Sequence, residues 1–571
     1  MDKQKLEELL LTVQKPGRYA GGEWNAVRKD WTPDKVKFLL AFPDVYEVGM
    51  SNLGLKILYG ILNGRADCLC ERVFSPWSDF EAVLRSNNIE LFSLESRKPI
   101  KEFDIIGFSL AYELSYTNIL NIIDMGGIAV RSSERADGDP LIIAGGPAAF
   151  NPEPMTDFID AFVIGDGEEA VGEIIETYKI SKSSSGSSRK ELLRAISRIK
   201  GVYVPSFYNV EYSDDGTIKK FYTAEEGVPA KIEKRVTQDL DGAFYPVKQI
   251  VPNIQVVHDR LAIEIMRGCK HACAFCQAQA IYRPCRERSK ERILNIARDA
   301  YAATGYGEIS LLSLSSVDHS DLKEVIGQLN CEFSSKAISI SVPSLRIEDS
   351  LGDLPFLISK TKKTGLTFAP ESGSERIRKT INKNIGIDKL FKALEESFRT
   401  GWRHVKLYFM IGLPGETKED VLMINELIYK ASEVRRSVDG KTANVTASIN
   451  PFIPKPHTSL ERSAMDDIRA LEGKRLLLRG SMKSKFVELD FHSFNMSYIE
   501  AVFARGDRRL GQAIFVSWKN GARFDGWSDI FNFNTWCSSF QSSGIDPAFY
   551  ATRKRAPDEI LPWDFILLRA A

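Results

Sequence analysis

Four of the eight cysteines, Cys269, Cys273, Cys276 and Cys285, lie within 17 residues of a chain of 571. A chain of this length can bury a large apolar core, so its stability does not depend on a disulfide scaffold. Thiols gathered in one short segment are instead typical of metal or redox chemistry. The sequence therefore indicates a metal or redox centre near residue 270.

The spacing of the first three cysteines fits an iron–sulfur cluster that keeps one open position. Steps of four and three residues let one short loop wrap three corners of a cubane cluster. The fourth iron would have no protein ligand and could accept a small molecule. If Cys285 is added, the four thiols could instead hold a structural zinc ion or a closed electron-transfer cluster. A zinc site usually combines two short Cys-x2-Cys turns, and only one is present here.

The elements that must position this loop alternate regularly from residue 256 to residue 465. Six apolar runs are predicted as strands, and each of the first five precedes a helix-like stretch: Leu261–Met266, Ile309–Leu314, Ile338–Val342, Leu366–Ala369, Val405–Ile411 and Val445–Ile449. The helix after the fifth run begins with a capping-box pattern at Thr417 and Asp420. Six strand–helix repeats predict a partial (β/α)6 version of the parallel barrel, which places its chemistry at the carboxyl ends of the strands. The cysteines follow the first strand, so they belong to that edge.

At that position the loop resembles the signature of the radical S-adenosylmethionine (SAM) superfamily. The signature is a Cys-x3-Cys-x2-Cys loop with an aromatic residue, here Phe275, before the last cysteine. Segments at later strand ends are similar to those that contact SAM in this superfamily. They contain Ser313, Ser315 and Ser316 after the second strand, Glu371, Ser372 and Arg376 after the fourth, and Ile411 and Gly412 at the fifth.

The resemblance implies a cofactor set and a reaction. Cys269, Cys273 and Cys276 would bind a [4Fe-4S] cluster, and SAM would chelate its open iron. One electron, from a donor such as flavodoxin or ferredoxin, would cleave SAM to methionine and a 5′-deoxyadenosyl radical that abstracts hydrogen from a C–H bond. The cofactors perform this chemistry, so no general base is expected.

A second alternation of strands and helices occupies residues 34–180 and predicts a doubly wound parallel sheet. Its predicted strands are Val36–Ala41, Leu91–Leu94, Ile105–Leu110, Leu141–Ala144 and Ile159–Ile164. The residues at the strand ends resemble those of cobalamin-binding domains: Asp44, Tyr46, Gly49, Ser109, Gly145, Gly146, Gly165 and Gly167. Some cobalamin proteins have an Asp-x-His-x-x-Gly loop, and here Tyr46 replaces the histidine. Tyrosine is a poor cobalt ligand at neutral pH, so either cobalamin binds without a lower protein ligand or this domain positions substrate instead.

The remaining cysteines of this domain argue against one class of radical SAM enzyme. Methylthiotransferases of the superfamily carry three N-terminal cysteines for a second cluster. This domain has only Cys68 and Cys70, so that layout is rejected.

The C-terminal hundred residues contain arginines among aromatic and acidic residues. Arg505, Arg508 and Arg509 could clamp a phosphate of the substrate, or they could pair with Asp507, Asp525 and Asp564 in a structural network. The order of domains, with the Ala504–Arg509 motif and Leu561-Pro562-Trp563-Asp564, resembles a group of bacterial radical SAM proteins.

The expected fold class is α/β, with the doubly wound sheet, the partial barrel and a C-terminal α/β cap. The predicted divisions are an arm at 1–33, a cobalamin-binding-like domain at 34–180, a flexible linker at 181–190, a connecting segment at 191–255, the barrel at 256–465 and the cap at 466–571. The chain has 76 basic and 76 acidic residues, so its net charge is no argument for a nucleic-acid partner. It has no apolar run near the roughly 20 residues of a membrane helix, and its first residues are too charged for a signal peptide.

The sequence therefore predicts a cytoplasmic radical SAM enzyme with no membrane partner. If cobalamin binds, methylation of an unactivated carbon is the natural reaction; otherwise another C–H functionalisation follows. The substrate stays open and includes nucleic acid. The rival interpretation is a non-catalytic RNA-binding adaptor or redox sensor that holds iron–sulfur or zinc.

Overall fold

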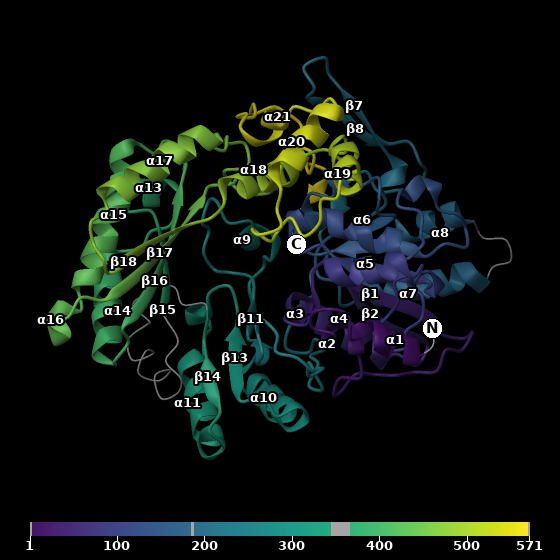
Figure 1. Ribbon diagram of the computed structural model, residues 1–571, viewed down its shortest axis with the longest axis horizontal. Helices are drawn as coiled ribbons and strands as arrows, with labels where there is room; N and C mark the ends of the chain where they lie inside the picture. The colour runs from purple at the N-terminus through teal and green to yellow at the C-terminus, as the bar shows by residue number, and fades with distance from the viewer. Residues whose placement is uncertain (1–2, 184–187, 344–365, 569–571) are drawn as a thin grey trace.

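The computed structural model describes residues 3–183, 188–343 and 366–568. Figure 1 shows the N-terminal lobe on the right, the barrel region in the lower centre and on the left, and the C-terminal helices across the top between them. The fold class is α/β with parallel sheets, as predicted.

The N-terminal lobe is built on a six-stranded sheet with the order β2-β1-β3-β4-β5-β6. All neighbours are parallel except β5 and β6. This order places the usual ligand crevice of a doubly wound sheet at the carboxyl ends of its strands. The strands are β1 (Val36–Phe42), β2 (Cys68–Phe74), β3 (Ile105–Ser109), β4 (Leu141–Gly145), β5 (Ala161–Val163) and β6 (Val202–Tyr203). The helices of this half of the chain are α1 (Lys3–Leu10), α2 (Gly17–Ala20), α3 (Tyr46–Gly49), α4 (Leu53–Gly64), α5 (Ser78–Ser86), α6 (Tyr116–Met125), α7 (Ala170–Ser183) and α8 (Arg189–Ile196).

One strand prediction for this sheet is wrong. Leu91–Leu94 forms only an isolated bridge between Phe92 and Pro99, and β2 takes the place beside β1. Every residue of β2 is buried, including Arg72, which pairs with Glu23 at 3.0 Å and Glu95 at 2.7 Å. Charged residues inside a buried strand break the apolar run, which is why the pattern did not reveal it.

The connecting segment joins the two lobes. Within the predicted linker 181–190, residues 184–187 lie outside the described residues, 181–183 end α7, and Ser188 caps α8 with a capping box. The strands β7 (Tyr208–Tyr212) and β8 (Ile218–Thr223) pair in an antiparallel hairpin. The short strand β9 (Ile232–Glu233) then pairs with β19 (Ile566–Leu567) near the end of the chain.

All six predicted barrel strands are present and lie in two parallel sheets. The first sheet contains β10 (Leu261–Glu264), β13 (Glu308–Leu312) and β14 (Ser339–Ser341). The second contains β15 (Leu366–Glu371), β16 (His404–Ile411), β17 (Asn444–Pro451) and a further strand that was not predicted, β18 (Val487–Phe491). Within the described ranges no pairing joins β14 to β15. A two-stranded ribbon of β11 (Met266–Arg267) and β12 (Arg286–Glu287) follows β10 and brackets the cysteine loop.

Helices cover these sheets and form the cap. They are α9 (Gln277–Ile281), α10 (Lys290–Thr304), α11 (Leu322–Phe333), α13 (Glu375–Thr380), α14 (Ile387–Arg399), α15 (Lys418–Glu433), α16 (Arg436–Asp439), α17 (Ile468–Ser481), α18 (Phe494–Ala504), α19 (Leu510–Lys519), α20 (Phe533–Ser542) and α21 (Pro547–Ala551). The predicted capping box of Thr417 and Asp420 begins α15. None of the described helices is long and apolar enough to cross a membrane.

Candidate active site between two lobes

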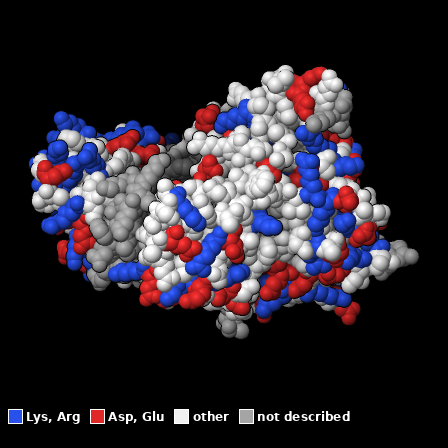
Figure 2. Space-filling view, turned by 90° about the horizontal axis from the view of Figure 1, so that it is seen from below, with Lys and Arg blue, Asp and Glu red and all other residues white. Residues whose placement is uncertain are grey.

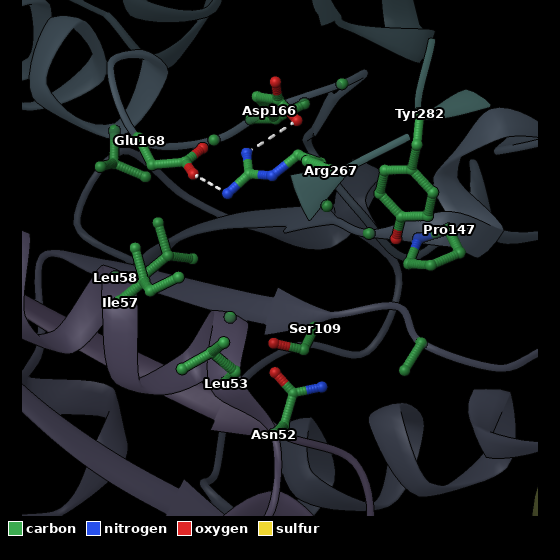
Figure 3. Close-up of a pocket in the computed structure, with 18 of the residues that line it drawn as sticks. Asn52, Leu53, Ile57, Leu58, Ser109, Pro147, Asp166, Glu168, Arg267 and Tyr282 are labelled. Carbon is green, nitrogen blue, oxygen red and sulfur yellow. Dashed lines mark ion pairs between the residues drawn. The ribbon is translucent and has the colours of Figure 1, made fainter. Parts of the chain in front are cut away.

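A cavity of about 560 Å³ lies between the N-terminal sheet and the first barrel strands. One wall is the carboxyl edge of β1, β3, β4 and β5, together with the start of α4. The opposite wall is formed by the segment that leads into the cysteine loop and by the end of β13, from Leu312 to Leu314. Figure 3 shows Leu53, Ile57 and Leu58 of α4 on one side and Pro147 with Tyr282 on the other. The cavity therefore connects the glycine-rich sheet edge with the predicted SAM strands.

Glycines shape the sheet side of this cavity. Gly146 has φ 124°, and a Cβ added there would lie 2.7 Å from the carbonyl oxygen of Leu110. Gly165 has φ 108°, and its Cβ would lie 2.1 Å from the carbonyl oxygen of Arg235. Neither position accepts a side chain without a backbone shift. Glycine at these two positions therefore lets the sheet edge pack closely against the backbone of Leu110 and of Arg235.

Five of the eight residues predicted for cobalamin line this cavity: Ser109, Gly145, Gly146, Gly165 and Gly167. Asp44, Tyr46 and Gly49 do not. The hydroxyl of Tyr46 donates to Glu23 at 3.0 Å, and burial raises its pKa. Asp44 accepts a hydrogen bond from the indole of Trp527 at 3.0 Å, and Gly49 packs against the ring of Phe74. The Asp-x-Tyr-x-x-Gly segment thus contributes to packing behind the sheet edge.

The cysteine loop begins directly at the cavity wall. Gly268 lines the cavity with φ 91°, and the loop that follows carries Cys269, Cys273 and Cys276. Burial raises the pKa of the Cys276 thiol, and the neighbouring thiols of Cys273 and Cys269 raise it further. Cys269, Cys273 and Cys276 are not disulfide-bonded. The donor set is therefore three neighbouring thiols on one loop.

Three thiols on one short loop are a donor set that a cubane cluster can use. Among the described residues, no three His, Cys, Asp or Glu side chains are grouped closely enough to hold one metal ion. A cubane cluster offers a separate iron to each thiolate, so its ligands need not converge on one point. Cys285 lies on the turn behind Gly268, beside the loop. The residues present fit a cluster bound by Cys269, Cys273 and Cys276.

The serines after β13 lie at the far wall of the cavity. Ser313 lines it, and its hydroxyl oxygen is 2.8 Å from that of Ser316. Ser315 is 3% exposed, and its hydroxyl has no hydrogen-bond partner in the part of the chain that the structure describes. A buried hydroxyl without a partner is costly, so the hydroxyl of Ser315 is available to a polar ligand group.

The end of β15 is distorted at its last residue, Glu371. This residue has φ 67°, lies where the register with β16 shifts, and pairs with Lys383 at 3.1 Å. A non-glycine residue in the left-handed region is often part of a functional site. Ser372 is fully buried, and its hydroxyl accepts a hydrogen bond from the backbone N–H of Ser374. Arg376 is directed elsewhere: it bonds to the carbonyl of Gly415 and to Asp420, so it links the β15 and β16 loops.

The end of β16 packs directly behind the cysteine loop. Ile411 is buried, and Gly412, with φ 84°, donates its N–H to Glu416 at 2.7 Å. Phe275 packs on a small apolar cluster formed by Ile377, Ile381, Leu413 and Phe452. The aromatic residue before the last cysteine thus holds the loop against the fourth and fifth strand ends.

Charged residues that the sequence does not single out join the two walls. Arg267 pairs with Asp166 at 3.1 Å and with Glu168 at 2.6 Å (Figure 3). It also pairs with Glu264 at 2.9 Å. Burial opposes ionisation of Asp166, but Arg267 and the nearby Arg286 lower its pKa overall. The sequence holds one signal for this contact, the turn of residues 165–168 (Gly-Asp-Gly-Glu). Two carboxylates at a buried sheet edge need a cationic partner.

The three arginines predicted to bind substrate are used within the protein. Arg505 is fully buried and donates to the carbonyls of Ala551 and Arg553. Arg508 pairs with Glu153 at 2.8 Å, and Arg509 pairs with Asp507 at 2.6 Å. The alternative of a structural network therefore describes their contacts, but its predicted partners are only partly right. Asp507 is a partner and Glu153 is another, whereas Asp525 accepts from Thr117 and Trp536 and Asp564 accepts from the N–H of Leu561.

Comparison with known proteins agrees with this geometry. The family model of N-terminal domains of radical SAM proteins matches residues 54–205, and that of the radical SAM superfamily matches residues 263–428. The protein MJ0966 of Methanocaldococcus jannaschii is 28% identical over 485 residues, which cover 84% of this chain and 90% of that one. A solved structure of the radical SAM methyltransferase TsrM from Kitasatospora setae, with cobalamin and a [4Fe-4S] cluster bound, has a similar fold. It is 12% identical, with a TM-score of 0.51 over 75% of this chain and 77% of that one.

The two family models together cover more than half of the chain, in the predicted order. The second spans the cysteine loop, the serines after β13 and the segments at the ends of β15 and β16. On these findings, the chain belongs to the radical SAM superfamily of enzymes.

Proposed function

We propose that this protein binds a [4Fe-4S] cluster through Cys269, Cys273 and Cys276, binds SAM beside it, and holds a cobalamin in the cavity between the lobes. The observation that carries the proposal is that one cavity is lined both by the glycine edge and by Gly268, the residue before the cysteine loop. When bound, these groups supply a 5′-deoxyadenosyl radical or a methyl group for C–H functionalisation. We favour methylation of a carbon atom as the reaction.

The protein's own residues would bind and orient these groups. The orphan hydroxyl of Ser315 and the Ser313–Ser316 pair offer polar contacts to SAM. Phe275 and Gly412 hold the loop and the fifth strand end in place. The mainly apolar residues of α4 and the sheet edge would exclude water from the reacting groups. A low-potential donor such as flavodoxin or ferredoxin is proposed as the electron source.

We further propose that cobalamin binds without a protein ligand to cobalt. None of the described residues that line the cavity is a histidine, and Tyr46 hydrogen-bonds to Glu23 behind the sheet edge. Contact would then come from the apolar side chains and the glycine backbone. We therefore favour cobalamin bound without a lower protein ligand over a domain that only positions substrate.

The nucleic-acid alternative has less support. Arg505, Arg508 and Arg509 already bond within the chain. Figure 2 shows Lys and Arg interspersed with Asp and Glu over one face of the molecule, rather than gathered in a basic stripe. A nucleic-acid site usually shows such a stripe.

An anaerobic titration with hydroxocobalamin tests the cavity. Gly167→Leu should weaken binding by about tenfold or more, because the new side chain enters the cavity where only Leu58 is near. Gly64→Leu at the end of α4 is the matched control, since an added Cβ there meets nothing within 4 Å. Equal affinity of the wild type and both variants, or no uptake by the wild type, would reject cobalamin in this cavity.

A further inference from the structure

The back wall of the cysteine loop is a turn whose carbonyl groups are held by two buried cations. The ammonium of Lys234 donates to the carbonyls of Ile281 at 3.0 Å and Arg283 at 2.5 Å. The guanidinium of Arg286 donates to those of Tyr282 at 3.3 Å and Pro284 at 3.1 Å. Four successive carbonyls are therefore bound alternately by the two side chains.

This turn contacts the loop at both of its ends. Cys276 is the N-cap of α9, and Ile281 is the last residue of that helix. On the other side, a Cβ added to Gly268 would lie 2.8 Å from the carbonyl oxygen of Tyr282 and 2.9 Å from that of Pro284. A helix of five residues has little stability of its own, so its position depends on such external contacts.

Lys234 comes from outside the barrel. It follows β9, its backbone N–H donates to Leu567 at 2.9 Å, and the next residue, Arg235, bridges to Gly165 of the glycine edge. Its side chain is buried, with the residue 2% exposed, and burial lowers its pKa to about 8. A buried ammonium is costly unless its donors are used, and backbone carbonyls at a helix C-terminus favour a cation.

We infer that Lys234 is a positioning residue for the cysteine loop: with Arg286, it holds the 281–284 turn in the place that lets Cys269 and Cys276 act together. Lys234 thereby gives the connecting segment a role at the cysteine loop. Only the expected effect on the cluster rests on the proposed function, because the placement of the loop can be measured without a cluster.

The first test uses the full-length apoprotein. Lys234→Met should loosen the turn, so alkylation of Cys269 and Cys276 by iodoacetamide, followed by mass spectrometry, should become about tenfold faster. The exposed thiols of Cys331 and Cys537 serve as internal references and should react at the same rate in every variant. Lys234→Arg should restore slow alkylation. Lys234→Gln keeps a hydrogen-bond donor and should give an intermediate rate. It serves as the test variant if Lys234→Met does not fold.

A matched control separates this role from general stability. Lys56 of α4 is also a buried lysine, and its pKa is lowered to about 8. Its ammonium donates to the side-chain oxygen of Gln249 and not to the turn behind the cysteine loop. Lys56→Met should leave the alkylation of Cys269 and Cys276 unchanged. Equal rates in wild type and folded Lys234→Met, or the same acceleration in Lys56→Met, would overturn the inference.

The second test uses reconstituted protein. Iron release to a chelator should be about tenfold faster in Lys234→Met, with changed g-values of the reduced cluster in EPR, and near normal in Lys234→Arg. If the wild type binds no iron while alkylation still responds to Lys234, the proposed function fails and the positioning role stands. If iron is bound normally and neither readout responds, the positioning role fails and the proposed function stands.

Discussion

At the scale of single residues, the structure places Cys276 and Cys285, which the spacing already separates, in different surroundings. Cys276 caps α9 and is near the thiols of Cys269 and Cys273, whereas Cys285 lies on the supporting turn behind Gly268, where its thiol is near that of Cys269. The aromatic residue between the last two loop cysteines, Phe275, packs on its own apolar cluster. Spacing alone could select the three ligands, but only the packing shows what supports them.

Replacement of these cysteines should give opposite results. Cys276→Ala should reduce iron in the reconstituted protein to near zero and abolish SAM cleavage, because a cubane with two thiolates is poorly held. Cys285→Ala should retain iron and cleavage at the wild-type level. Loss of the cluster in the second variant would identify Cys285 as a ligand and contradict the three-cysteine assignment.

His457 is expected to make stability depend on pH. Burial lowers its pKa from 6.5 to about 4, and its Nε2 lies 2.8 Å from the carbonyl oxygen of Phe150, to which it donates. Between pH 6.5 and 4 the unfolded chain takes up a proton that the folded protein resists, so stability falls as the pH falls. The effect is on the order of 2–3 kcal/mol.

Melting temperatures measured from pH 7 to pH 4 test this effect. His457→Gln keeps an N–H donor but cannot titrate, so its melting temperature should fall less over that range than that of the wild type. Parallel curves for the two proteins would show that His457 does not titrate in this way.

At the scale of elements, apolar periodicity predicts the barrel well. All six predicted strands are present because each is a short apolar run bounded by polar segments. Apolar periodicity missed β2 because it contains the charged residues Glu71 and Arg72. Both are buried, and they form hydrogen bonds and ion pairs with residues of other segments. Such partners lie far away in the sequence, so no local pattern contains them.

The glycine edge gives a prediction at this scale. Gly165→Ala should destabilise the protein by about 1–3 kcal/mol, because the residue has φ 108° and its Cβ would overlap the carbonyl oxygen of Arg235. Gly64→Ala, at an open position, should leave the melting temperature unchanged or slightly raised. An equally stable Gly165→Ala protein would show that this edge tolerates side chains and is not shaped as described.

At the scale of the whole molecule, the active site is assembled from segments that sequence analysis treats separately. Asp166 and Glu168 of the N-terminal lobe bind Arg267 beside the cysteine loop, and Lys234 of the connecting segment binds the turn behind it. The sequence predicts each lobe and six of the residues that line the cavity: Ser109, Gly145, Gly146, Gly165, Gly167 and Ser313. It does not predict which charged residues meet across the lobes, because that depends on the relative placement of three folded parts.

The cap should act mainly as a structural brace. Arg508→Ala leaves Glu153, whose side chain is 1% exposed, without its arginine, and should cost about 2–4 kcal/mol of stability. Arg399→Ala removes an exposed helical pair with Glu395 and should cost under about 0.5 kcal/mol. Thermal unfolding of both variants measures the difference. A stable Arg508→Ala protein that had lost substrate or RNA affinity would instead support the phosphate-clamp interpretation.

The measurement that tests the central claim most directly is made on anaerobically reconstituted protein, reduced with dithionite and given SAM. Iron and sulfide are counted per chain, and 5′-deoxyadenosine and S-adenosylhomocysteine are assayed. We predict about four irons and formation of at least one of these products by the wild type, with neither in Cys276→Ala. Zinc in place of iron, no metal, or equal product from the Cys276→Ala protein would contradict the account.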